Sequence, residues 1–218
     1  MSIITIERKV LEKNDELARK NRELFARQKN FVINLVSSPG SGKTSLLEAT
    51  LAKVKQRASV AVIEGDVQTD LDAQRVAKLD VPVVQIVTNG GCHLEAKLVH
   101  DALQSLDLSA VDLLVIENVG NLVCPANYDL GEALKVVVLS VTEGDDKPLK
   151  YPTMFRNASV VIVNKVDLLP YVNSNVETLK QNALSINPNL TVFEVSCRTG
   201  QGLDAWCDWL IEHSARKG

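Results

Sequence analysis

A glycine-rich segment with the order Ser37-Ser38-Pro39-Gly40-Ser41-Gly42-Lys43-Thr44 has the composition of a phosphate-binding loop. Glycines allow backbone N–H groups to wrap around phosphate oxygens, and a helix N-terminus directly after them adds a favourable dipole. Ser37 replaces the usual first glycine, but the core of the motif is intact. We expect Lys43 to reach the β- and γ-phosphates and the Thr44 hydroxyl to bind Mg²⁺. The predicted phosphate-binding residues are Gly40, Ser41, Gly42, Lys43, Thr44 and Ser45.

The segment Asn164-Lys165-Val166-Asp167 matches the NKxD pattern that recognises guanine. The Asp167 carboxylate can accept hydrogen bonds from the ring N–H and the exocyclic amine of guanine, whereas adenine offers no such pair of donors. Asn164 and Lys165 are expected to brace the loops around the base. Ser196 and Cys197 follow a later aliphatic run, where a backbone loop would contact the guanine carbonyl. Together these residues favour GTP over ATP.

Acidic residues complete the expected site. Asp66 follows an aliphatic run and is expected to bind Mg²⁺ or to position the attacking water, and Glu117 ends another run as a second candidate ligand. Gly120 would let the backbone approach the γ-phosphate. Asp70 and Asp72 are further candidates, but exposed acids on a helix face are the commoner arrangement. Phosphoryl transfer depends on positioning and charge neutralisation, so slow Mg²⁺-dependent hydrolysis is expected. The predicted catalytic residues are Lys43, Asp66 and Glu117.

Sulfur and imidazole groups indicate a further kind of chemistry. Cys92-His93 follows two glycines at the start of a predicted helix, and Cys124-Pro125 lies in the segment after Glu117. Thiolate and imidazole are ligands for Zn²⁺ and Ni²⁺. From position alone, buried structural cysteines explain the pattern equally well. The chain has only four cysteines, so a disulfide-stapled scaffold is not expected.

These segments must be positioned by a regular framework, and aliphatic runs alternate with stretches of helical spacing from Phe31 onward. The predicted strands are 31–36, 59–63, 83–87, 111–116, 134–141, 159–163 and 191–195. The predicted helices are about 43–56, 69–79, 93–105, 175–186 and 203–213. This pattern predicts an α/β doubly wound P-loop NTPase fold, a mostly parallel sheet with helices on both faces. Because ligands bind at the carboxyl ends of parallel strands, the segments above should meet at one edge.

Residues 1–30 carry apolar positions seven apart, which predict one stripe on an amphipathic helix. The rows are Ile3, Val10, Leu17 and Leu24, and beside them Ile4, Leu11, Ala18 and Phe25. A helix packed on the domain is the favoured interpretation, and a partner-binding arm is the alternative. We therefore divide the chain into an N-terminal helix, 1–30, and a GTPase domain, 31–218.

Composition excludes several classes of protein. Aromatic residues make up 4% of the chain and the net charge is −3, which argues against a nucleic-acid partner. No apolar run approaches the roughly 18 residues of a membrane span, and the N-terminus lacks the apolar core of a signal peptide. A cytoplasmic protein without a membrane partner is expected.

The chain resembles the hydrogenase nickel-incorporation GTPases, the HypB family of SIMIBI-class P-loop GTPases, in six motifs: SSPGSGKT, GDVQTDLDAQR, GGCHLEA, IENVGNLVCPA, KPLKYP and NKVDLLPY. The resemblance runs from about Phe31 to the C-terminus. It implies a homodimer formed through the nucleotide-binding face, with Cys92, His93 and Cys124 binding Zn²⁺ or Ni²⁺ there. It also implies nickel delivery during [NiFe] hydrogenase maturation. The implied partners are GTP and GDP, hydrogenase maturation proteins and the hydrogenase large subunit precursor.

Two alternatives stay open beside this family. Urease accessory GTPases also deliver nickel, but their metal motif resembles Cys-Pro-His, whereas Cys92 and His93 are adjacent here. A regulatory GTP-binding module would use its cysteines only for packing. Some members of the resembled family begin with a cysteine-rich or histidine-rich nickel motif. Residues 1–30 contain neither residue type, so a separate tight nickel site is not expected.

Overall fold

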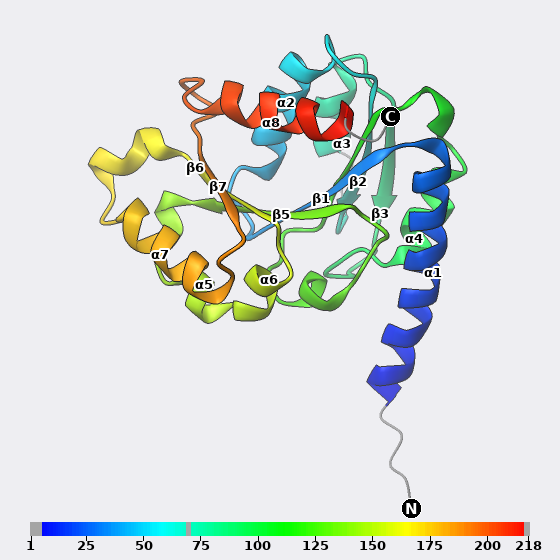
Figure 1. The fold of residues 1–218 in the computed structure, drawn as a ribbon, viewed down its shortest axis with the longest axis horizontal. Helices are drawn as coiled ribbons and strands as arrows, with labels where there is room; N and C mark the ends of the chain where they lie inside the picture. Colours follow the sequence, from blue (N-terminus) through cyan, green and yellow to red (C-terminus); the bar gives the residue numbers. More distant parts are fainter. Residues whose placement is uncertain (1–5, 69–70, 216–218) are drawn as a thin grey trace, which may run out of the picture.

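The computed structural model describes residues 6–68 and 71–215. Its centre is a seven-stranded sheet in which every strand pair is parallel, with the order β3-β2-β4-β1-β5-β6-β7 (Figure 1). The strands are β1 (Phe31–Ser37), β2 (Val60–Asp66), β3 (Val83–Val87), β4 (Leu113–Glu117), β5 (Leu134–Ser140), β6 (Val160–Asn164) and β7 (Thr191–Glu194). The predicted α/β fold is confirmed, and all strands end at the same edge.

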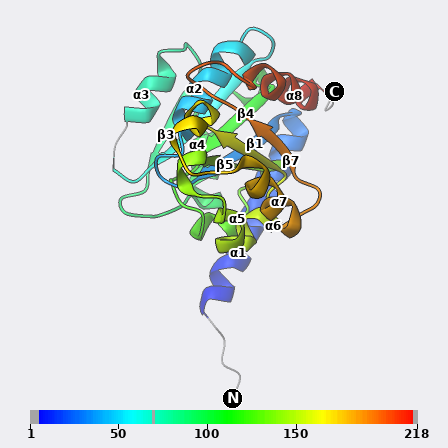
Figure 2. The same ribbon diagram turned by 90° about the vertical axis from the view of Figure 1, so that its left-hand side faces the viewer.

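Helices cover both faces of the sheet, as the two views in Figures 1 and 2 show. One face packs against α2 (Lys43–Val54), α3 (Leu71–Ala77) and α8 (Leu203–Ala215). The other face packs against α1 (Ile6–Gln28), α4 (Ala96–Leu103), α6 (Pro152–Arg156) and α7 (Val176–Ile186). The short helices are η1 (Leu108–Ala110), η2 (Cys124–Asn127), η3 (Val141–Glu143), α5 (Lys147–Lys150) and η4 (Val166–Tyr171).

The structure differs from the prediction in two boundaries and two short helices, for local reasons. β2 continues to Asp66, beyond the predicted end at residue 63, because Glu64 pairs with β4 while Gly65 and Asp66 pair with β3. α4 begins at Ala96, so Cys92 and His93 lie in the preceding loop rather than at a helix start. α5 and α6 were not predicted, because each has only a few residues and no helical periodicity can be read over that length.

The helix α8 packs against α2, the helix that follows the phosphate-binding segment. The indole Nε1 of Trp206 donates a hydrogen bond to Thr50 Oγ1 on α2 at 3.0 Å. Trp209 stacks on Trp206 with 5.8 Å between ring centroids. Both partners of the hydrogen bond are buried, so the two helices are fixed relative to each other.

The N-terminal helix α1 packs against α4, and its N-terminal end extends away from the body of the domain (Figures 1 and 2). Ala18 and Phe25 of the predicted stripe are buried. The same side of the helix also buries Asn14 and Asn21, which the apolar pattern did not identify. The stripe residues Ile3 and Ile4 and the side chain of Val10 lie outside the described part of the chain. The boundary between 1–30 and 31–218 stays a prediction.

Buried amides fasten α1 to its neighbours. Asn14 accepts a hydrogen bond from Ala96 N at 2.8 Å and donates one to Asp129 O at 2.8 Å. Asn21 Nδ2 donates to Ala96 O at 3.0 Å and to Leu130 O at 3.1 Å. Because these partners lie on α4 and on the segment before β5, the helix is tied to two separate parts of the domain.

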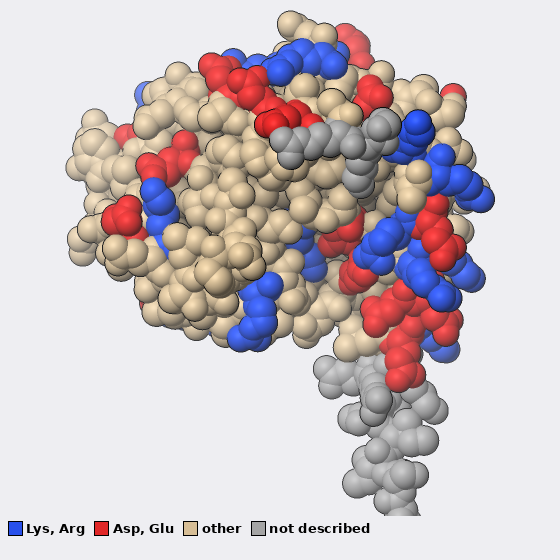
Figure 3. Space-filling model, in the orientation of Figure 1, with Lys and Arg blue, Asp and Glu red and all other residues tan. Residues whose placement is uncertain are grey.

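Charges on the surface are mixed in sign. On the face shown in Figure 3, basic and acidic side chains alternate along α1 without forming a patch of one sign. Among residues 6–68 and 71–215, no helix combines the length and the apolar character needed to cross a bilayer.

Replacing Asn21 with alanine tests the buried amide. The change leaves the carbonyl oxygens of Ala96 and Leu130 without this donor, so we expect the free energy of unfolding to fall by about 1–3 kcal/mol. Urea denaturation measures the effect. Lys20→Ala on the exposed side of the same helix is the control, and an equal loss in both variants would contradict this role for Asn21.

Candidate functional site

The segment from Ser37 to Thr44 joins β1 to α2 at the carboxyl edge of the sheet. Gly42 has a φ of 89°, and a Cβ atom there would lie 2.6 Å from Asn164 Nδ2, so only glycine fits. Ser37, which replaces the usual glycine, turns its hydroxyl back to Ser38 O at 2.8 Å. The loop therefore keeps a tight turn despite the departure from the motif.

Two adjoining cavities open beside this loop. The first has a volume of about 550 Å³ and is lined by the loop, by the end of β2 and by the segment after β4. The second has a volume of about 440 Å³ and is lined by the loop after β6 and by Cys197 and Arg198. The predicted residues that line one or both are Gly40, Gly42, Lys43, Thr44, Ser45, Asp66, Gly120, Asn164, Lys165, Asp167 and Cys197. Ser41, Glu117 and Ser196 lie behind this lining and are buried.

Glu117 is the acidic partner of the phosphate-binding loop. Its Oε1 atom lies 2.5 Å from Lys43 Nζ and accepts a hydrogen bond from Thr44 Oγ1 at 2.6 Å. The Glu117 side chain is fully buried, whereas that of Lys43 is 10% exposed. The structure thus places the predicted lysine, hydroxyl and carboxylate in direct contact at the floor of the first cavity.

Three carboxylates converge beside Lys43. Glu64, Asp72 and Glu117 each offer an oxygen within 4.8 Å of the others. Glu64 and Glu117 are neighbours in register on β2 and β4. Burial, followed by the charge of Glu117, raises the pKa of Glu64 to about 10. One oxygen of Glu64 and one of Glu117 are buried without a hydrogen-bond partner among the described residues. Such oxygens suit a hard divalent cation.

The sequence did not identify Glu64 as a site residue, although a glutamate at the end of an aliphatic run was a usable signal. Asp66 lies two residues further along β2 and lines the cavity, where its carboxylate accepts a hydrogen bond from Gln68 N at 2.9 Å. It is outside the three-carboxylate cluster. Asp72, a further candidate for which an exposed helix-face acid was the favoured interpretation, is partly buried and belongs to that cluster. Asp70 lies outside the described residues.

The loop after β6 braces the phosphate-binding segment. Asn164 Nδ2 donates a hydrogen bond to Ser41 O at 3.0 Å, and Lys165 Nζ donates one to Gly40 O at 2.6 Å. Asp167 Oδ1 accepts a hydrogen bond from Ser196 Oγ at 2.6 Å. Ser196 therefore fixes the orientation of the Asp167 carboxylate, which lines the second cavity.

Cys92, His93 and Cys124 meet although they come from two loops. Their potential ligand atoms all lie within 4.8 Å of one another. Hydrogen bonding to Cys124, together with partial burial, raises the pKa of the Cys92 thiol. Burial lowers the pKa of His93, so its imidazole is neutral and able to bind a metal. His93 Nε2 is buried without a hydrogen-bond partner among the described residues, a position that suits a soft or borderline cation.

Asn121 connects the two loops and was not identified from the sequence. Its Nδ2 donates to Cys92 O at 3.2 Å, while its Oδ1 accepts from Val123 N at 2.8 Å and Cys124 N at 3.4 Å. Gly120, the residue before it, packs so closely on the phosphate-binding loop that a Cβ atom would lie 3.2 Å from Pro39 Cα. The Cys124 loop therefore starts at the wall of the nucleotide cavity.

A comparison with known proteins identifies the family. Residues 31–194 match the model of the CobW/HypB/UreG nucleotide-binding domain. The chain belongs to the CobW/HypB/UreG family. The hydrogenase maturation factor HypB of Escherichia coli K12 is 52% identical over 208 residues, a match that covers 95% of this chain and 72% of that protein. The resemblance to the HypB family is confirmed.

Solved HypB structures share the fold. HypB from Helicobacter pylori in complex with nickel has a TM-score of 0.89 and 42% identity, covering 94% of this chain and 96% of that chain. HypB from Archaeoglobus fulgidus has a TM-score of 0.87 and 39% identity, covering 93% of this chain and 99% of that chain. The roles of individual residues in this CobW/HypB/UreG family member stay predictions.

Glu64→Gln is expected to stabilise the protein at neutral pH. Because the pKa of Glu64 rises from 4.5 to about 10 on folding, its contribution is fully favourable only below about pH 4.5 and is lost progressively as the pH rises toward 10. Glutamine removes this penalty, so we expect the free energy of unfolding near neutral pH to increase by about 1–3 kcal/mol.

Urea denaturation at several pH values, without nucleotide or metal, measures the difference. Glu194→Gln, which changes a partly exposed carboxylate on β7, is the control. A difference between Glu64→Gln and the unmodified protein that stays constant from about pH 5 to about pH 9 would contradict the assignment.

Proposed function

We propose that this protein is a GTP-hydrolysing metallochaperone that delivers nickel during [NiFe] hydrogenase maturation. The observation that carries the proposal is that one segment, at the end of β4 and directly after it, contributes to both the nucleotide cavity and the metal cluster. This segment begins at Glu117 beside Lys43, packs against the phosphate-binding loop at Gly120 and ends at the thiol of Cys124. Curated relatives that are 52% and 53% identical to this chain are named hydrogenase maturation factor HypB, and one related solved structure is of a HypB in complex with nickel.

The nucleotide would be held by groups already fixed in place. Lys43 and the loop N–H groups would bind the β- and γ-phosphates, and Asp167 would accept the two donors of guanine. Asn164 and Lys165 would keep the base loop and phosphate loop together through their bonds to the carbonyls of Ser41 and Gly40. The side chain of Lys43 would have to exchange Glu117 for a phosphate oxygen on binding.

The acidic cluster fits Mg²⁺ because it brings three carboxylates together beside a single ammonium group, that of Lys43. Thr44, Glu117 and Glu64 would hold the ion, with Asp66 or Asp72 as outer ligands through water. Mg²⁺ would neutralise phosphate charge during transfer. Lys43 would stabilise the charge on the phosphates, and Asp66 at the cavity wall would orient water. Hydrolysis would be slow, since these groups position and neutralise rather than react.

The cargo would be held by Cys92, His93 and Cys124. Three ligands leave a tetrahedral ion one position short, and water or a second subunit could fill it. A homodimer through this face would bring two such sites together. Two apolar side chains near the sites are 62% exposed: Val123, directly before Cys124, and Leu71, directly before Asp72 of the cavity lining. Exposed apolar side chains at these places support such an interface. Both Ni²⁺ and Zn²⁺ suit the donor set.

Transfer would pass the ion toward hydrogenase maturation proteins and the hydrogenase large subunit precursor. Loss of the γ-phosphate would release Gly120, and the Cys124 loop would move with it. A regulatory module with packing cysteines is less well supported, because Cys92 is exposed and its thiol faces Cys124 and His93 rather than the apolar core.

Asp167→Asn should exchange guanine for xanthine specificity. An amide offers a donor where guanine also presents a donor, so GTP affinity should fall at least about tenfold while xanthosine triphosphate affinity rises. Isothermal titration calorimetry with both nucleotides measures the change. Glu177→Gln on the exposed side of α7 is the control. Unchanged GTP affinity would exclude Asp167 from base recognition.

Replacing Cys92 and Cys124 together with serine should abolish Ni²⁺ binding at micromolar concentration, since two soft ligands are lost. Cys207→Ala is the matched control, because Cys207 is a buried thiol on α8 far from this cluster. Equilibrium dialysis with GDP or a non-hydrolysable GTP analogue measures binding. If the unmodified protein binds nickel equally tightly with both nucleotides, the metal site is supported, but the proposed coupling between metal binding and GTP hydrolysis is wrong.

A further inference from the structure

A buried asparagine divides the apolar layer on the face of the sheet that α1 and α4 cover on one side and α6 and α7 on the other. Asn34 lies in the middle of β1, and none of its surface is exposed to solvent. On the same face of this strand, Val32 belongs to one apolar cluster and Val36 to another. Both polar ends of Asn34 are used, because Nδ2 donates to Glu132 Oε1 at 3.1 Å and Oδ1 accepts from Asn118 Nδ2 at 3.2 Å. Asn34 therefore joins two polar groups on opposite sides of β1.

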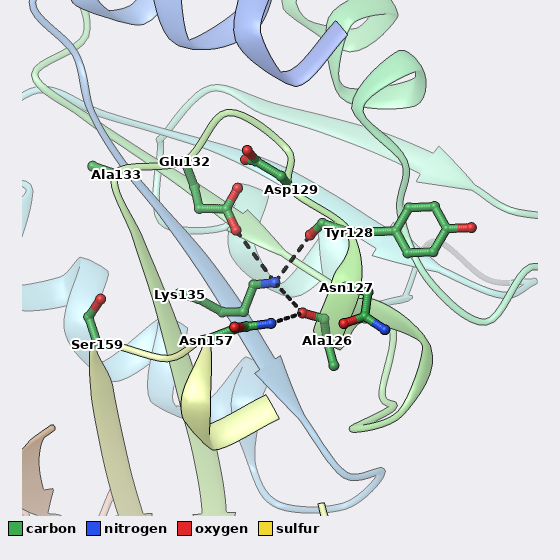
Figure 4. Close-up of a pocket in the computed structure, with 9 residues that line it drawn as sticks. All are labelled: Ala126, Asn127, Tyr128, Asp129, Glu132, Ala133, Lys135, Asn157 and Ser159. Carbon is green, nitrogen blue, oxygen red and sulfur yellow. Dashed lines mark hydrogen bonds and ion pairs between the residues drawn. The ribbon is translucent and has the colours of Figure 1, made fainter. Parts of the chain in front are cut away.

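The first branch leads to the loop that carries Cys124. Glu132 Oε1 lies 3.8 Å from the ammonium group of Lys135. That ammonium donates hydrogen bonds to Pro125 O at 2.9 Å, Tyr128 O at 3.1 Å and Ala126 O at 3.4 Å. Figure 4 shows the Lys135 side chain pointing toward the carbonyls of Ala126 and Tyr128, with Glu132 on its other side. The ammonium group of Lys135 thus binds three carbonyl groups of the turn directly after Cys124.

This branch also reaches the imidazole of the metal cluster. The ring of Tyr128 packs on the ring of His93 with 4.0 Å between their centroids. The Tyr128 carbonyl accepts its hydrogen bond from Lys135. Fixing the backbone of Tyr128 therefore fixes one wall of the His93 side chain as well.

The second branch leads to the loop that carries Cys92 and His93. Asn118 Oδ1 accepts hydrogen bonds from Leu94 N at 3.0 Å and from Val119 N at 2.9 Å. Leu94 directly follows His93, and Val119 directly precedes Gly120, which contacts the phosphate-binding loop. Asn118 is itself buried, so its amide holds both backbone groups without competition from water.

Such a chain costs stability to bury. Burial lowers the pKa of Lys135 and raises that of Glu132, which shows that the interior opposes both charges. Apolar residues of similar size often stabilise a fold as well as a buried ion pair does, so stability alone does not explain why these two charged groups are buried. The better explanation is that they position the backbone groups they bind. Together they connect Pro125, the residue after Cys124, with Asn34 on the central strand β1.

We propose that Asn34 is a positioning residue for the metal site, which sets the separation of the two ligand loops through the chain Lys135–Glu132–Asn34–Asn118. The proposal rests on the proposed function, in which Cys92, His93 and Cys124 bind a divalent metal. Asn34 itself touches neither the cluster nor the nucleotide cavity. Its effect reaches the ligands through two stretches of backbone. On one side these are Leu94 and Val119, and on the other they are the turn from Pro125 to Tyr128.

Asn34→Ala tests this role against a matched variant. Asn30→Ala also removes a fully buried asparagine, whose Nδ2 donates to the carbonyls of Leu108 and Val111 away from the metal loops. Ni²⁺ affinity is measured by competition with a metallochromic indicator on the full chain, and the Ni²⁺–thiolate charge-transfer band is recorded. We expect Asn34→Ala to lower Ni²⁺ affinity about tenfold and to shift the band. Asn30→Ala should leave the affinity within about twofold and the band unchanged.

Equal Ni²⁺ affinity in the two variants would overturn the proposal, even if both unfold more easily than the unmodified protein. Should Asn34→Ala fail to fold, Glu132→Gln gives the same test, because its amide cannot accept hydrogen bonds from Asn34 and Leu130 and also face Lys135. Loss of Ni²⁺ affinity in Glu132→Gln supports the proposal and unchanged affinity overturns it. If the unmodified protein binds no Ni²⁺, the proposed function fails first. If the unmodified protein binds Ni²⁺ and Asn34→Ala binds it equally tightly, only the positioning role of Asn34 is overturned.

Discussion

Two glutamates are buried side by side where adjacent parallel strands end, and one ammonium group opposes them. Glu64 and Glu117 are partners in register on β2 and β4, and Lys43 contacts Glu117 from the phosphate-binding loop. Burial, followed by the charge of Glu117, disfavours the ionised form of Glu64 and raises its pKa. The fold tolerates the cost at an edge where a bound divalent cation would relieve it. The surrounding loops are arranged around this concentrated charge.

Parallel topology explains why a site drawn from distant parts of the sequence could be predicted. Every strand in the described sheet runs in the same direction, so the segments after β1, β2, β4 and β6 meet at one edge. Aliphatic runs and glycine-rich or charged segments alternate along the chain, and that alternation is visible without coordinates. The motifs identified Lys43 and Asp167, and this rule predicted that they would lie at one edge, where the structure places them beside adjoining cavities.

The parts that could not be predicted depend on tertiary contacts. Glu64 ends an aliphatic run, but its burial opposite Glu117 depends on the pairing of β2 with β4, which no local pattern reveals. Asp72 stayed undecided between a site residue and a helix-face acid, because its partly buried position depends on how α3 packs over the cavity. Asn121 and Asn34 have no sequence signature, since their importance arises only from partners far along the chain. Polar residues that connect loops are therefore the part of a site that sequence patterns miss.

Both tryptophans of the chain stand on one helix, and this arrangement gives the protein an intrinsic optical reporter. The indole of Trp206 is bonded to Thr50 on α2, whose first turn contains Lys43 and Thr44. Trp209 stacks beside it, so the emission of the pair depends on how α2 and α8 sit together. A shift of α2 toward a bound phosphate would change the fluorescence without any added label.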